Sequence, residues 1–289
     1  MPELPEVEVL RLSLARRLLG VRITRVEVRD RRLREPVDGR RLARAVTGKR
    51  VLALERRSKY LLAHVEGGHT LVVHLGMSGR LTVVPARTPR IAHEHVVFHL
   101  EGGDRLRFVD PRRFGLVLAL PTTELARDPH FAALGPEPLA VNGEVAEPGA
   151  IASDGLPFDG VYLRHRAAGR RGPVKTFLMD AGVVVGVGNI YASEALHQAA
   201  IDPRRSVARI GADRWERLAT AVRAVLARAI TQGGTTLNDF VDGEGNPGYF
   251  QVALAVYDRE GEPCPRCGGT VRRVVQGGRS TYFCPRCQR

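Results

Sequence analysis

An N-terminal proline followed by a glutamate has the groups needed for covalent chemistry on a sugar. Met1 precedes a small residue, and its removal would leave Pro2 with a free secondary amine. An α-amino group titrates near pH ~8, so a fair fraction of it is neutral and nucleophilic at physiological pH. Attack by this amine on an aldehyde carbon gives an iminium, which weakens neighbouring bonds, and the adjacent Glu3 can move protons for it. A Pro-Glu dipeptide alone is more typical of an ordinary capped helix, so other segments must decide.

Lysine is rare in this chain, and its positions are therefore informative. Only three of the 44 basic residues are lysines, namely Lys49, Lys59 and Lys175. Arginine does not lose its proton in proteins, whereas lysine can. We therefore single out Lys59 and Lys175 as candidates for sites where a guanidinium group would not serve.

All four cysteines lie near the C-terminus in two C-x-x-C pairs separated by sixteen residues, at Cys264, Cys267, Cys284 and Cys287. This spacing predicts a four-thiolate zinc site, and four protein ligands leave no open position for catalysis. Two disulfides are the alternative, but no secretion signal supports them. Between the pairs, residues 271–283 can form a hairpin with Gly277-Gly278 at its tip. Arg279 follows the tip directly and is well placed to reach a phosphate.

The charge of the chain indicates a polyanionic partner. The net charge is +13 and the isoelectric point is about 10.5. Residues 1–120 contain 24 basic and 13 acidic residues, residues 262–289 contain 6 and 1, and residues 121–261 contain 14 and 17. Two basic ends around a near-neutral middle are typical of a nucleic-acid footprint, and a solvated basic face without a partner is the alternative. There is no apolar run long enough to span a bilayer and no signal peptide, so we expect a cytoplasmic protein.

The first element that must position these residues is a helix at the N-terminus. Residues 5–19 carry apolar side chains on one helical face, at Val7, Leu10, Leu14 and Leu18. Gly20 ends the pattern, and Pro5 suits the first turn because its missing N–H costs nothing there. The positive end of this helix points towards Pro2 and disfavours a protonated amine at that position.

Residues 21–120 show short runs of alternating apolar and polar residues, separated by turn signals such as Glu66-Gly67-Gly68. Strands are expected at residues 21–28, 51–54, 60–65, 70–75, 80–84, 96–100, 105–109 and 115–120. Many short strands at regular spacing predict an antiparallel β-sandwich, with the first helix packed on it. The following stretch to residue 160 is rich in Pro, Gly and acidic residues, and we expect a hinge and connector there.

The second half of the chain changes to a helical period. Residues 189–199 are expected to form a helix with Asn189 as a good N-cap after Gly186-Val187-Gly188. A longer helix is expected from Trp215 onwards, with its end at Gly233-Gly234. A helix that opens on a glycine-rich N-terminus can bind phosphate through its backbone N–H groups. Plain helix packing also explains the periodic residues without any nucleic acid.

Six sequence motifs and the terminal C-x-x-C pairs occur in an order that is typical of one family. The motifs are MPELPEVE at 1–8, LGMSG at 75–79, DPRRFG at 110–115, GVGNIYA at 186–192, QGGTTL at 232–237 and GYF at 248–250. Together they resemble the bacterial formamidopyrimidine-DNA glycosylase family over nearly the whole chain. The resemblance implies an α+β multidomain fold. Its expected parts are an N-terminal antiparallel β-sandwich with a leading helix, a connector, a helix–two-turn–helix domain and a four-cysteine zinc-finger hairpin, at residues 1–120, 121–160, 161–261 and 262–289.

The resemblance also implies roles for individual residues. It makes Pro2 the Schiff-base nucleophile and Glu3 a proton donor near the sugar. Lys59 matches the lysine that assists base loss and β-elimination, and an ordinary phosphate-binding lysine is the alternative. Arg279 matches the finger arginine that grips phosphate and acts in δ-elimination. Three residues match those that fill the void left by a flipped nucleotide, namely Met77, Arg112 and Phe114. The DNA-contacting positions that the resemblance implies are His93, Arg112, Arg170, Lys175 and Asn189.

The function implied is that of a bifunctional DNA glycosylase and AP lyase of base excision repair, which removes oxidised purines such as 8-oxoguanine and formamidopyrimidines. Its expected partner is damaged double-stranded DNA, with one structural Zn²⁺, no nucleotide cofactor, no membrane and a monomeric state. An endonuclease VIII-like enzyme for oxidised pyrimidines is the first alternative, although Leu4 and the Arg112–Phe114 pair favour the purine enzyme. A non-catalytic, zinc-containing DNA-binding protein is the second. It predicts damage at Pro2, Glu3 or Lys59, and all three are intact.

Overall fold

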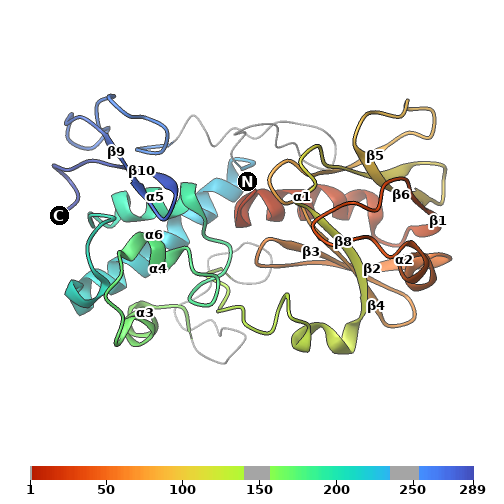
Figure 1. Ribbon diagram of the computed structural model, residues 1–289, viewed down its shortest axis with the longest axis horizontal. Helices are drawn as coiled ribbons and strands as arrows, with labels where there is room; N and C mark the ends of the chain where they lie inside the picture. Colours follow the sequence, from red (N-terminus) through yellow and green to blue (C-terminus); the bar gives the residue numbers. More distant parts are fainter. Residues whose placement is uncertain (1, 140–156, 235–253) are drawn as a thin grey trace. The chain divides into compact units, whose positions relative to one another are not determined.

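The computed structural model describes residues 2–139, 157–234 and 254–289 (Figure 1). The chain divides into two compact units. The N-terminal unit comprises Met1–Ala132 with Gln232–Gln251, and the C-terminal unit comprises Ala133–Thr231 with Val252–Arg289. The motif residues 235–237 and 248–250 lie outside the described residues, as do residues 140–156 of the expected connector. The domain boundaries expected from the sequence therefore stay a prediction.

The expected N-terminal helix is present as α1 (Leu4–Leu18). Its apolar residues at the predicted spacing are buried, and each is 2% exposed or less. A capping box closes its first turn, because the carboxylates of Glu3 and Glu6 each accept the backbone N–H of the other residue. Gly20, with a φ of +77°, follows the C-terminal end and lets the chain turn towards the first strand.

Eight antiparallel strands form the sheet of the N-terminal unit, in the order β5-β7-β6-β1-β2-β3-β4-β8. They are β1 (Arg22–Val28), β2 (Lys49–Arg57), β3 (Tyr60–Val65), β4 (His69–His74), β5 (Arg80–Val84), β6 (Glu94–Leu100), β7 (Arg105–Val109) and β8 (Leu116–Pro121). All eight expected strands are present. In this unit the helix α2 (Gly39–Val46) was not predicted, and it begins where the Asp38 side chain accepts the N–H of Arg41. A 3₁₀ helix, η1 (Thr122–Arg127), follows β8.

The sheet consists of two four-stranded halves that share one core. The strands β1 and β2 join the halves through only two residue pairs, Arg22 with Arg50 and Ile23 with Lys49. One core cluster takes side chains from both halves and from α1, among them Phe98, Phe108 and Leu61. The expected β-sandwich with a leading helix is therefore confirmed, and Figure 1 shows α1 in red beside the strands.

The C-terminal unit is helical and ends in a two-stranded hairpin. Its elements are α3 (Gly160–Ala167), α4 (Val174–Leu178), α5 (Asn189–Gln198), η2 (Val207–Arg209), α6 (Ala212–Thr231), β9 (Arg272–Gln276) and β10 (Arg279–Phe283). The predicted helices at 189–199 and from Trp215 onwards are both present, whereas α3 and α4 were not predicted. The prediction that Asn189 is the N-cap of the first was wrong, because Gly188 takes that position and Asn189 is the first residue of α5. Trp215 is 1% exposed and meets the ring of Phe177 edge-on at 5.6 Å, so helix packing accounts for it.

The start of the finger is anchored to α5 by one carboxylate. Glu194 is 4% exposed, and its two oxygens accept the backbone N–H groups of Ala255, Val256 and Tyr257 at 2.8–3.0 Å. Burial raises the pKa of Glu194, while the three amide donors favour its charged form. This contact fixes the direction in which the chain enters the finger.

Candidate active site and nucleic-acid interface

The predicted nucleophile lies directly before the start of α1. Pro2 is half-buried and directly precedes Glu3, the N-cap residue. The N–H of Glu3 donates to Glu6 Oε2 at 2.7 Å, and both glutamates are 2% exposed. Because the N-terminal end of a helix carries partial positive charge, it favours a neutral amine on the preceding residue. The arrangement can present a nucleophilic amine beside a buried carboxylate.

A glycine from the far end of the sequence lies against this helix start. Gly234 belongs to the N-terminal unit and has a φ of +76°. A Cβ at that position would lie 3.4 Å from Glu6 Cγ and Glu6 Oε1. The backbone at Gly234 therefore passes close to the first turn of α1, and a Cβ there would be in van der Waals contact with Glu6.

Lys59 lies in the tight turn between β2 and β3. Arg57 pairs with Tyr60, so Ser58 and Lys59 form a two-residue hairpin loop. Ser58 has a φ of +57° and is 4% exposed, whereas Lys59 is half-buried. The turn projects the Lys59 side chain from the end of two paired strands, a rigid support for a group that handles protons.

The three predicted void fillers come together on two neighbouring loops. Met77 is 39% exposed and Phe114 is 46% exposed, both unusual for large apolar side chains. The guanidinium carbon of Arg112 lies 5.1 Å from the centre of the Phe114 ring, in a cation–π contact. Exposed apolar side chains next to a stacked arginine form a surface that can enter a base stack.

Asp110 joins these two loops from the inside. It is 0% exposed, and its carboxylate accepts the Ser78 hydroxyl at 2.6 Å and the Gly115 N–H at 2.7 Å. The N–H of Arg112 donates to Ser78 Oγ at 3.2 Å. A Cβ on Gly76 would lie 2.4 Å from the carbonyl carbon of Phe114, so the two backbones touch directly. The loops that carry the predicted void fillers therefore behave as one unit.

A neutral histidine supports the first of these loops. The Gly76 N–H donates to His74 Nδ1 at 2.9 Å, so that ring nitrogen carries no proton. Burial, with the positive charges of Arg34 and Lys59, lowers the pKa of His74 to about 3. Arg34 Nε also donates to the Phe114 carbonyl at 3.0 Å, which links the second loop to the same cluster.

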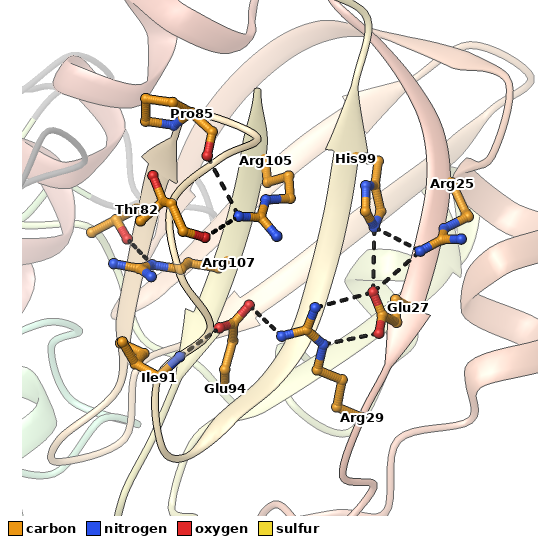
Figure 2. A network of polar contacts seen from close by, with 11 residues as sticks. Arg25, Glu27, Arg29, Thr82, Pro85, Ile91, Glu94, His99, Arg105 and Arg107 are labelled. Carbon is orange, nitrogen blue, oxygen red and sulfur yellow. Dashed lines mark hydrogen bonds and ion pairs between the residues drawn. The ribbon is translucent and has the colours of Figure 1, made fainter. Parts of the chain in front are cut away.

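His93 lies exposed on a segment that a polar network fixes to the sheet (Figure 2). Figure 2 shows Glu94 between the Ile91 N–H and the Arg29 guanidinium, at 3.3 and 2.9 Å. The carbonyl of His93 accepts the Asp110 N–H at 3.0 Å, which ties this segment to the void-filler loops. A cavity of about 380 Å³ adjoins it, lined by residues 90–95 with Asp30 and Arg113.

In the C-terminal unit, Lys175 is buried and contacts Asn189 from the protein interior. Lys175 is 1% exposed, and its ammonium donates to Asn189 Oδ1 at 2.6 Å, Thr281 Oγ1 at 2.7 Å and the Ser280 carbonyl at 3.2 Å. Asn189 begins α5, and its Nδ2 donates to the same carbonyl at 3.0 Å. The predicted DNA contact of Lys175 stays a prediction, and in the structure its buried ammonium group is hydrogen-bonded to Asn189.

The predicted phosphate contact Arg279 and the predicted DNA contact Arg170 are both exposed arginines. Arg279 directly follows the glycine pair at the tip of the β9–β10 hairpin and is exposed. Arg170 pairs with Asp180 at 3.0 Å and lies over the Phe177 ring at 5.5 Å. Arg279 is therefore available to an incoming phosphate, whereas Arg170 must exchange a surface ion pair for one.

The four cysteines form the predicted metal centre. Their Sγ atoms all lie within 4.8 Å of one another. The Cys267 and Cys284 sulfurs are 3.5 Å apart and the Cys264 and Cys287 sulfurs 3.9 Å, too far for disulfide bonds of ~2.05 Å. The Gly269 N–H, which donates to Cys267, lowers the pKa of that thiol to about 7, whereas burial raises the pKa of Cys284 and of Cys287. The cluster fits one structural zinc ion.

Comparison with known proteins agrees with these features. Residues 1–117 match the family described as "Formamidopyrimidine-DNA glycosylase N-terminal domain", residues 152–241 its H2TH domain, and residues 261–289 the "Zinc finger found in FPG and IleRS". The formamidopyrimidine-DNA glycosylase of Acidithiobacillus ferrooxidans is 51% identical over 289 residues, and that of Alteromonas mediterranea is 50% identical over 290, each match covering both chains completely. The chain belongs to the formamidopyrimidine-DNA glycosylase family. It is a DNA glycosylase.

Solved structures of this family have the same fold as the glycosylase described here. The MutM (Fpg) protein of Thermus thermophilus superimposes with a TM-score of 0.83 at 38% identity, covering 99% of this chain and 98% of that one. A Lactococcus lactis Fpg variant in complex with a Fapy-dG containing DNA superimposes with a TM-score of 0.87 at 29% identity, covering both chains completely. Among the described residues of the glycosylase, no helix is long and apolar enough to cross a membrane.

Several residues that shape the glycosylase's site were not predicted from its sequence. Asp110 stands in a recognised motif, but nothing in its spacing indicates that its carboxylate joins two loops. Arg34 and His74 contact Phe114 and Gly76, and periodicity reveals neither contact. The only available signal for Asp110 was its place in a turn next to glycine and proline, where aspartate often bonds backbone N–H groups.

Proposed function

We propose that the protein removes oxidised purines from duplex DNA and then cleaves the strand at the resulting abasic site. The observation that carries this proposal is the half-buried Pro2 directly before a buried, capping Glu3. The related Lactococcus lactis Fpg forms complexes with Fapy-dG containing DNA and with abasic-site containing DNA, which supports the same substrate class here.

In the proposed reaction, the Pro2 nitrogen attacks C1′ of the damaged nucleotide and the bond from C1′ to the base breaks. The base leaves with the proton that the amine loses. The C1′–O4′ bond of the sugar then breaks, O4′ takes a proton from Glu3, and an iminium links the protein to the opened sugar. The iminium acidifies the C2′ hydrogen, so that loss of this proton expels the 3′ phosphate, and a second elimination expels the 5′ phosphate. Glu3 and Lys59 move the protons in these steps.

The other predicted residues bind DNA and open the duplex. Met77, Arg112 and Phe114 occupy the space that the flipped nucleotide vacates, and Arg112 can donate hydrogen bonds to the unpaired base opposite. Arg279 and Asn189 hold phosphates, with Lys175 behind Asn189. Further phosphate contacts come from His93 and Arg170. The zinc ion holds the finger that carries Arg279, and it takes no part in the chemistry.

We further propose that the protein acts as a monomer in the bacterial cytoplasm and needs no nucleotide cofactor. Oxidised pyrimidines are a second candidate substrate class, because the Lactococcus lactis Fpg also forms a complex with an oxidized pyrimidine containing DNA. Competition between duplexes that contain an oxidised guanine and an oxidised pyrimidine would rank the two classes.

The decisive experiment is to trap the covalent intermediate. Borohydride reduces an iminium, so mixing the protein with an 8-oxoguanine duplex and borohydride should give a protein–DNA adduct that maps to Pro2. Retention of Met1 or the change Pro2→Gly should abolish the adduct or reduce it sharply. An adduct that maps mainly to Lys59 or Lys175 would contradict the proposal.

A further inference from the structure

A buried carboxylate in α1 is shared by two arginines. Arg11 Nη2 donates to Glu8 Oε1 at 2.6 Å, and Arg56 Nε donates to Glu8 Oε2 at 3.1 Å. The side chains of Glu8 and Arg56 are 1% and 2% exposed, and that of Arg11 is 11% exposed. Each carboxylate oxygen therefore has its own charged donor, the arrangement in which a buried ion pair is least costly.

The two arginines then contact β2 at different points. Arg11 Nη1 donates to the Leu54 carbonyl at 3.3 Å, in the middle of the strand. Arg56 Nη1 donates to the Ser58 carbonyl at 3.0 Å, at the turn. The Ser58 carbonyl belongs to the peptide bond with Lys59, so Arg56 holds the backbone immediately before that lysine.

Stability alone is a weak reason for such a cluster. Apolar side chains of similar volume often replace a buried ion pair with no loss of stability. What directional bonds add is geometry, because a carboxylate and a planar guanidinium fix both distance and angle. Glu8 lies five residues after Glu3 on the same helix, so a rigid body connects the predicted nucleophile to this cluster.

We propose that Glu8 and Arg56 are positioning residues that set the Lys59 turn against the helix start with Pro2 and Glu3. This inference rests on the proposed role of Lys59 in base excision. Neither residue needs to touch DNA, since both side chains are buried. Their effect reaches the chemistry through the Ser58 carbonyl and the start of α1.

The sharpest test is Arg56→Lys, with Arg11→Lys as the matched control. A lysine at 56 keeps the positive charge beside Glu8 but has no second N–H directed at the Ser58 carbonyl. Lysine at 11 makes the same chemical change in the other arm of the cluster, away from the turn. Single-turnover rates should be measured on an 8-oxoguanine duplex and on a duplex with a preformed abasic site.

Arg56→Lys should lower base excision by about 10- to 100-fold and abasic cleavage by much less, because small misplacements of a catalytic group have effects of this size. Arg11→Lys should change both rates to a similar, small extent. The double variant Arg56→Lys with Lys59→Ala should excise the base no more slowly than Lys59→Ala alone. Its thermal unfolding midpoint should still be lower than that of Lys59→Ala. Glu8→Gln, which keeps the side-chain shape, should repeat the selective loss and serves if Arg56→Lys does not fold.

Equal ratios of excision to abasic cleavage in the two lysine variants would overturn the inference, as would additive losses of excision in the double variant. The proposed role of Lys59 has its own readout. Unchanged excision by Lys59→Ala would contradict that role and the inference with it. A selective loss in Lys59→Ala without one in Arg56→Lys or Glu8→Gln would overturn the inference alone.

Discussion

The Ser78 hydroxyl donates a hydrogen bond of 2.6 Å to Asp110 Oδ1, and this contact joins two loops that lie 32 residues apart in the sequence. One loop carries Met77 and the other carries Arg112 and Phe114. These three void fillers form a wedge that must keep its shape when it enters the base stack of DNA. Because they lie on separate loops, they can do so only if the loops are held together. The buried carboxylate of Asp110 provides this connection.

Ser78→Ala should therefore loosen the connection between the two loops that carry the wedge, while leaving the active-site groups unchanged. The lost bond to a charged acceptor should lower the free energy of unfolding by about 1.5–3 kcal/mol. Excision from duplex DNA should slow more than cleavage at a preformed abasic site in a flexible single strand, where no stack must be opened. Thermal unfolding and single-turnover rates check both. Thr82→Val is the control, because it removes a hydroxyl from β5 that accepts a bond from Arg107 Nε and does not join the two loops. An equal loss on both substrates would contradict this account.

Phe114→Ala and Arg112→Ala should separate stacking from reading of the opposite base. Phe114→Ala should slow excision from duplex DNA with nearly unchanged salt dependence of nonspecific binding, because no phosphate contact is lost. Arg112→Ala should in addition reduce discrimination among the four opposite bases. Single-turnover excision opposite each base, with salt titrations on undamaged duplex, measures both effects. If Phe114→Ala cuts as fast as the parent, the side chain is not part of the wedge.

Lys175→Met should weaken DNA binding indirectly. The ammonium group is buried against Asn189, so its loss should misplace Asn189 without removing a cation from the DNA surface. Loss of one phosphate contact makes the slope of log affinity against log salt less steep by about 0.9. For Lys175→Met we expect a smaller change in this slope. Arg279→Met is the control, for which the full change in slope is expected. Equal slope changes in both variants would show that Lys175 binds phosphate directly.

Removal of zinc should unfold the finger and abolish tight DNA binding, because metal binding supplies its folding energy. Loss of β10 also removes the Ser280 and Thr281 partners of Lys175, so the damage should extend to Asn189. Trp215, the single tryptophan, is buried in the C-terminal unit and reports this change by fluorescence. Hydrogen exchange in β3 and β4 should stay slow, since their core is separate. Normal binding and cutting by the metal-free protein would contradict this prediction.

The neutral His74 should make stability depend on pH in the acidic range. Its pKa is about 3 in the folded protein and ~6.5 in the unfolded chain, so the unfolded state binds the proton first as pH falls. The contribution of the neutral His74 to the free energy of unfolding is intact above pH ~6.5. Below that pH it decreases by up to about 1.4 kcal/mol per pH unit. Denaturant unfolding of the parent and of His74→Asn between pH 7 and pH 4.5 measures the difference. Parallel stability curves would argue against a neutral His74.

Local patterns in the sequence predicted much of the fold and the metal site. The apolar spacing of Val7, Leu10 and Leu14 predicted the first helix, because apolar residues at a 3.6-residue period are typical of an amphipathic helix. The C-x-x-C pairs predicted the metal site, because ligand spacing is itself a geometric constraint. The helix α2 was not predicted, since it is only eight residues long, begins with Gly39 and relies on the Asp38 cap.

Contacts between distant residues could not be predicted in this way. The Arg34 side chain and the Phe114 carbonyl are separated by 80 residues, and only the folded sandwich brings them together. The burial of Lys175 was also not predicted, because lysine is almost never fully buried unless its ammonium group is paired with polar groups. In both cases the partner is a side chain or carbonyl whose position depends on the whole unit.

The contact between Gly76 and the Phe114 backbone prevents other residues from replacing glycine at position 76 during evolution. A Cβ at position 76 would meet main-chain atoms at 2.4–2.6 Å, and no rotamer change elsewhere can move them. No atom lies within 4 Å of a Cβ at Gly102 or Gly103 in the β6–β7 turn, so only their positive φ, and no neighbouring atom, opposes a side chain there. Neutral drift should therefore accumulate at the far end of the sandwich, while position 76 stays glycine as long as the second loop keeps its path.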